Sequence, residues 1–100
     1  MTSPAPDGEV LSIFFPMWNE EHYVERAVTM AKRVCERMVT DGTIADYELL
    51  IVDDASTDRT PELADKLAAE DPHVRVIHHE RNRKLGGSIK TGFANARGDL

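Results

Sequence analysis

Three short segments, far apart in the chain, contain residue types that suit the binding of a small anionic ligand. Segment 16–20 combines a proline, which stiffens the backbone, with a carboxylate and a tryptophan ring that could stack on a base. Segment 53–54 is a pair of aspartates, one of which could accept hydrogen bonds from a base or a ribose. Segment 81–88 combines cations, glycines and a predicted helix start, which are the parts of an anion site. The candidate ligand-binding residues are Pro16, Trp18, Glu20, Asp53, Asp54, Lys84, Gly86 and Gly87.

Each segment also has an ordinary structural explanation. Because side chains alternate along a strand, only one of the two aspartates can point in a given direction, and the other can cap the turn at 56–57. Trp18 can cover the surface where a strand passes into a helix, and Glu20 can serve the helix N-terminus. The basic segment 81–88 can be a loop without a ligand, since its spacing matches neither a P-loop nor the fingerprint G-x-G-x-x-G.

Composition limits the classes of protein to consider. The 100 residues are 41% hydrophobic and 30% charged, which is typical of at most one soluble globular domain. No apolar run approaches the roughly 20 residues that cross a bilayer, and Cys35 has no cysteine to pair with, which suits a reducing, cytoplasmic location. The net charge of −6 argues against a general nucleic-acid binder, although residues 72–100 carry 6 basic and 2 acidic groups, a local balance of +4.

The elements that must position these segments alternate along the chain. We expect residues 1–9 to be a flexible tail and residues 10–100 to form the domain. The pattern predicts strands at 10–15, 47–52 and 74–77, a helix from an Asn19 cap to 40–42, a helix from Thr60 to 71–72, a third helix after the basic loop 81–87, and the opening of a fourth strand at 99–100. We expect the first strand to be buried on both faces.

This alternation predicts a Rossmann-like α/β fold with a parallel sheet. Ligands bind such sheets outside the carboxyl ends of the strands, so the three segments should meet at one rim. The adjacent His78 and His79 should face apart and serve the structure, and Cys35 should pack in the core.

Together the segments resemble the N-terminal, nucleotide-binding half of a family 2 glycosyltransferase with the GT-A fold, and most of all its dolichyl- and polyprenyl-phosphate sugar synthases. The resemblance covers residues 10–100, and the matching stretches are 11–21, 49–60 and 82–93. It implies a partial glycosyltransferase domain that stops at the start of the fourth strand of that fold.

The resemblance also implies roles for the candidate residues. Pro16, Trp18 and Glu20 would line the nucleotide pocket, where the family usually has Tyr at the position of Trp18. Asp54 would read the base edge, with Asp53 beside it. The donor would be a UDP- or GDP-sugar, and its ribose and diphosphate would lie near three residues of the basic segment: Lys84, where the family often has Gly, and Gly86 and Gly87.

The family's D-x-D metal motif lies a few residues beyond a Gly-Asp such as Gly98-Asp99, outside these 100 residues. The resemblance therefore implies no catalytic residue or metal ligand here, although the full-length enzyme would use Mg or Mn to transfer a sugar with inversion to a polyprenyl or dolichyl phosphate. We expect the 100 residues alone to be inactive, and the full-length protein to work at the cytoplasmic face of a membrane. The fourth strand would lie against residues 11–15, so an open edge there predicts self-association.

Two other classes of protein share parts of this pattern. A receiver domain of a signalling protein also has an acidic pair, but after its first strand, and has an aspartate at the end of its third, where this chain has His78 and His79. A dinucleotide-binding oxidoreductase has its glycine fingerprint after the first strand, where this chain has residues 16–20.

Overall fold

A computed structural model describes residues 8–100, so residues 1–7 of the predicted tail lie outside the described part. Strands and helices alternate as predicted, in the order β1 Val10–Met17, α1 Val24–Thr40, β2 Asp46–Asp53, α2 Thr60–Glu70, β3 Val74–His78 and α3 Lys84–Asn95. Among residues 8–100, no helix has the length and apolarity needed to span a bilayer.

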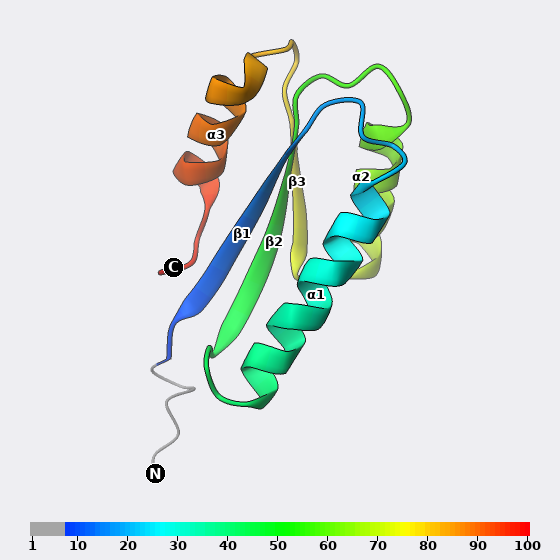
Figure 1. The fold of residues 1–100 in the computed structure, drawn as a ribbon. Coiled ribbons are helices and arrows are strands. Elements are labelled where there is room, and N and C mark those ends of the chain that lie inside the picture. Colours follow the sequence, from blue (N-terminus) through cyan, green and yellow to red (C-terminus); the bar gives the residue numbers. More distant parts are fainter. Residues whose placement is uncertain (1–7) are drawn as a thin grey trace.

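The three strands form one parallel sheet in the order β1-β2-β3, which confirms the predicted Rossmann-like α/β fold. Helices α1 and α2 cover one side of the sheet and α3 covers the other (Figure 1). Met17 pairs in register with Asp53, and Asp53 pairs with His78, so the three strands end at the same level. Everything that follows the strands therefore meets at one rim.

The core is centred on β2, whose residues Leu49, Leu50, Ile51 and Val52 are completely buried. Leu49 and Ile51 pack with residues of α1 and α2, including Val28. Because β2 has a strand on each side and helices on both faces, its side chains have no route to solvent.

Strand β1 differs from the prediction, because most of its residues are only partly buried. The expectation of burial on both faces is wrong for this strand. It lies at an edge of the described sheet, where only residues 98–100 pair with it: Ser12 donates its N–H to the Leu100 carbonyl at 3.1 Å, and Leu100 donates to the Val10 carbonyl at 3.2 Å. An edge strand keeps part of each side chain open to solvent.

Two helix starts also differ from the sequence-based expectation. Asn19 does not cap α1, which begins five residues later, because Asn19 has a φ of +52° and its side chain caps a different loop. Helix α3 begins earlier than expected, at Lys84, so Gly86 and Gly87 lie in its first turn and not in a loop. As a result, Trp18 and Glu20 lie in a longer loop than predicted, and Gly86 and Gly87 lie in a helix.

Candidate functional site

The loop after β1 is fixed by hydrogen bonds to the loop after β2. Asn19 donates its N–H to the Ser56 hydroxyl at 3.0 Å, and its side-chain oxygen accepts the Thr57 N–H at 2.8 Å. Glu20 donates its N–H to the Thr60 hydroxyl at 2.8 Å. These bonds hold the backbone on both sides of Asn19, and so they set where Trp18 and Glu20 stand.

Asp54 is the buried carboxylate of the site, with 4% of its surface exposed. Its Oδ1 atom accepts the Arg83 N–H at 2.7 Å and lies 2.8 Å from Nδ1 of His79. Burial alone raises the pKa of this carboxyl, but the hydrogen bonds from His79 and the Arg83 N–H outweigh it and leave the pKa below its ordinary value. Asp54 is therefore an ionised acceptor at neutral pH.

His79 joins Asp54 to helix α3. The other ring nitrogen of His79 lies 2.8 Å from the Thr91 hydroxyl, and Thr91 lies 3.0 Å from the Gly87 carbonyl oxygen, to which it can donate. His79 is buried, as a histidine with a structural role should be. The sequence analysis predicted a structural role for His79 but not its partner, because nothing in the sequence pairs His79 with Asp54 in particular.

Asp53 points away from Asp54, as the alternation along a strand predicts. Its Oδ1 accepts the Ser56 N–H at 3.1 Å, and its Oδ2 lies 2.7 Å from Nδ1 of His78. Asp53 therefore caps the turn that follows β2 and does not face the cavity described next. The two histidines likewise face apart, each against one aspartate.

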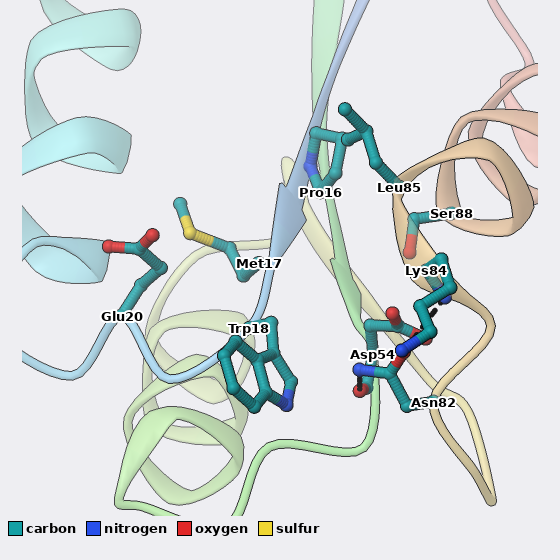
Figure 2. Close-up of a pocket in the computed structure, with 9 residues that line it drawn as sticks. All are labelled: Pro16, Met17, Trp18, Glu20, Asp54, Asn82, Lys84, Leu85 and Ser88. Carbon is teal, nitrogen blue, oxygen red and sulfur yellow. Dashed lines mark hydrogen bonds between the residues drawn. The ribbon is translucent and has the colours of Figure 1, made fainter.

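A cavity of about 400 Å³ opens at this rim, between the three segments (Figure 2). That volume lies within the range of small-molecule sites. Of the eight candidate residues, five line the cavity: Pro16, Trp18, Glu20, Asp54 and Lys84. Asp53, Gly86 and Gly87 do not line it, and the sequence analysis missed four residues that do: Met17, Asn82, Leu85 and Ser88.

The walls of the cavity differ in character. The ring of Trp18 lies across from Asp54 and Asn82 in Figure 2, with Pro16 at the far end. Trp18 is 53% exposed, so its ring is available to a ligand. One side of the cavity therefore offers an apolar ring and the other offers hydrogen-bonding groups.

The start of α3 brings positive charge to the cavity. Lys84 lines it, and no acidic residue lies in the first turn of α3, whereas α1 has Glu25 and α2 has Glu62 there. Gly87 is needed for packing, because a Cβ on it would collide with the side chain of Arg83, whereas Gly86 faces open space. Packing therefore requires a glycine at position 87 but not at position 86.

The residues of this part of the chain do not fit a divalent metal. Within residues 8–100 no group of three or more His, Cys, Asp or Glu side chains comes together as a metal site. Glu20 and Asp54 are the carboxylates that line the cavity, and Oδ1 of Asp54 already receives two hydrogen bonds.

Comparison with known proteins gives this geometry a context. The chain is 33% identical over 92 residues to the glycosyltransferase AglD of Haloferax volcanii, which covers 92% of this chain and 14% of that protein. It is 33% identical over 91 residues to the dolichyl-phosphate beta-glucosyltransferase of Mus musculus, which covers 89% of this chain and 28% of that protein. The chain thus spans less than a third of the length of these relatives.

The fold has a counterpart among solved structures. The mannosyltransferase PcManGT from Pyrobaculum calidifontis, solved in complex with GDP-Man and Mn2+, matches 91% of this chain and 25% of its own with a TM-score of 0.69 and 22% sequence identity. This likeness supports the GT-A type of Rossmann-like fold. The sequence model of glycosyl transferase family 2 matches residues 12–100. This chain belongs to glycosyl transferase family 2.

Proposed function

We propose that this chain forms the donor-nucleotide site of a glycosyltransferase that uses a UDP- or GDP-sugar. The observation that carries the proposal is the cavity in which Trp18, Asp54 and Lys84, from three separate segments, face one space. An aromatic ring, an ionised acceptor and a cation are the groups that a base and a diphosphate need. Family membership agrees with this function and gives no support to a receiver or an oxidoreductase domain.

In this arrangement the base would stack on Trp18 beside Pro16, and its edge would donate a hydrogen bond to Asp54. The diphosphate would lie toward Lys84 and the first turn of α3, where the ammonium group and the helix dipole favour negative charge. Gly86 and Gly87 would contribute backbone, and Asp53 would act only by shaping the turn after β2. Glu20 would lie at the side of the base.

The activity of the whole protein is proposed on wider grounds. It would transfer a sugar with inversion to a polyprenyl or dolichyl phosphate at the cytoplasmic face of a membrane, as the name of the mouse relative suggests for the acceptor. A divalent metal, Mg or Mn, would neutralise the departing diphosphate, and the Mn2+ in the mannosyltransferase structure supports this. The metal ligands, the general base and the acceptor site would lie outside these 100 residues, which would be inactive alone.

Titration with nucleotides tests the proposed site. Trp18 is the sole tryptophan of the chain, so its fluorescence should change as UDP or GDP binds. Replacing the ring by Trp18→Ala should weaken binding, measured by calorimetry, by roughly tenfold, because stacking on a base contributes about 1–3 kcal/mol.

Tyr23→Ala is the matched control for that substitution. Tyr23 is 56% exposed, close to the 53% of Trp18, but it does not line the cavity. It should leave nucleotide affinity unchanged. Failure of the unmodified chain to bind any nucleoside diphosphate, or an equal loss in both variants, would contradict the proposed function.

We also propose that the chain self-associates through the free part of β1. Residues 98–100 pair with the beginning of β1, at Val10 and Ser12, and among residues 8–100 no strand pairs with its later part on that side. Exposed strand edges pair with other chains. Light scattering should show a mass that rises with concentration, and a monomer at all concentrations would contradict this proposal.

A further inference from the structure

Ser88 carries a buried hydroxyl without a partner. The residue lies early in α3 and is only 1% exposed, and within residues 8–100 its oxygen has no hydrogen-bonding group in reach. Oδ2 of Asp71 is buried in a similar way, but it forms an ion pair with Lys32 at 2.8 Å. A buried polar group that is left unpaired lowers the stability of a fold, so the hydroxyl of Ser88 needs another explanation.

Ser88 lines the same cavity as Asp54. Figure 2 shows its hydroxyl on the side of the cavity that carries Asp54, facing the space across from Trp18. Asp54 is tied to the helix that carries Ser88, because it bonds to the Arg83 N–H at the start of α3 and, through His79, to Thr91 further along the helix. An acceptor and an unused hydroxyl, carried by segments that are bonded to each other, therefore line the same cavity.

Resting on the proposed function, we infer that Ser88 and Asp54 together read the imide edge of a nucleobase. The carboxylate of Asp54 accepts the ring N–H, and the hydroxyl of Ser88 donates to the carbonyl oxygen next to it. Uracil and guanine both present an N–H beside a carbonyl. Cytosine and adenine present a bare ring nitrogen there, which would face the negative charge of Asp54 without a proton between them.

The substitution Ser88→Ala separates this role from a structural one. Removing an unpaired hydroxyl should leave the midpoint of urea denaturation unchanged or raise it, since Ala is also the better helix former. Affinity for UDP and GDP, measured by calorimetry, should fall roughly three- to tenfold, the value of one hydrogen bond. Affinity for CDP and ADP should stay as weak as it is in the unmodified chain.

Ser12→Ala is the matched control, because the hydroxyl of Ser12 is paired. It donates to Glu48 and accepts the Gly98 N–H at 2.7 Å, and Ser12 does not line the cavity. Its removal should lower the denaturation midpoint and leave all nucleotide affinities unchanged. The two serines should thus give opposite results in the two measurements.

Each contrary outcome has a distinct meaning. If the unmodified chain binds UDP or GDP and Ser88→Ala binds it equally well, the reading of the base by Ser88 is wrong while the proposed function stands. An equal loss for all four nucleotides would place Ser88 against ribose or phosphate, and a lower denaturation midpoint would show a structural role; either overturns the inference. If no nucleotide binds the unmodified chain, the proposed function fails and this inference fails with it.

Discussion

Lys84 combines a cavity-facing cation with a backbone conformation that suits glycine. Its φ is +64°, in the left-handed region, where a side chain crowds the following carbonyl oxygen. Two substitutions separate these properties. Lys84→Ala removes the ammonium and keeps the strain, whereas Lys84→Gly removes both.

The left-handed conformation costs a non-glycine residue roughly 1–2 kcal/mol, and a glycine at this position relieves that cost. The greater freedom of glycine in the unfolded chain takes back roughly 0.5–1 kcal/mol of the stability gained. Lys84→Gly should therefore be about 1 kcal/mol more stable than Lys84→Ala, which in a chain of this length raises Tm by about 5 °C. Both variants should lose the same nucleotide affinity, roughly fivefold, because an exposed cation contributes up to about 1 kcal/mol.

Thermal denaturation and calorimetric titration with UDP and GDP measure the two effects on the same samples. Lys90→Ala controls for the loss of a cation from α3, since Lys90 does not line the cavity. Equal stability of the Ala and Gly variants would refute the argument from backbone strain. An affinity loss in Lys90→Ala as large as that at position 84 would show that only overall charge matters.

Two further substitutions test the packing and the electrostatics of the fold. Gly92→Ala should lower stability by about 2 kcal/mol in a urea denaturation, because a Cβ there would overlap the ring of Phe14; unchanged stability would show that α3 does not press on β1. Burial raises the pKa of Asp71, but the Lys32 ammonium and the hydrogen bonds from His73 outweigh it, and the pKa falls from 3.8 to about 2. A carboxyl whose pKa is lowered by folding stabilises the fold at pH values above its pKa in the unfolded chain, and this stabilisation is lost as the pH falls. The free energy of unfolding of the native chain should therefore exceed that of Asp71→Asn by about 2 kcal/mol at neutral pH, and the difference should shrink between about pH 4 and pH 2. A stability difference that stays constant over this pH range would contradict the ion pair's role.

The order of strands and helices could be predicted from sequence because each element carries its own local signal. The apolar run 49–52 forms a buried strand, and the Thr60-Pro61 start of α2 is where the pattern placed it. Once parallel strands alternate with helices, topology alone brings the segments after β1, β2 and β3 to one rim. Trp18 and Asp54 could therefore be assigned to one site although they lie 36 residues apart.

The errors arose where contacts between distant segments override local preference. Asn19 has the residue type of a helix cap, but it turns to accept the Thr57 N–H, 38 residues away. The glycines of the basic segment indicate a loop, yet α3 starts ahead of them, where the Arg83 N–H donates to Asp54, 29 residues away. No window of sequence contains such pairs.

Several residues fix the cavity-lining side chains by hydrogen bonds without lining the cavity themselves. Ser56 and Thr60 fix the loop that carries Trp18, and His79 fixes Asp54, yet none of the three lines the cavity. Each belongs to a segment that follows the neighbouring strand of the sheet: Ser56 and Thr60 come after β2, and His79 comes after β3. The positions of the cavity-lining residues therefore depend on a second set of polar residues at the same rim, and the segment 53–60 contains members of both sets.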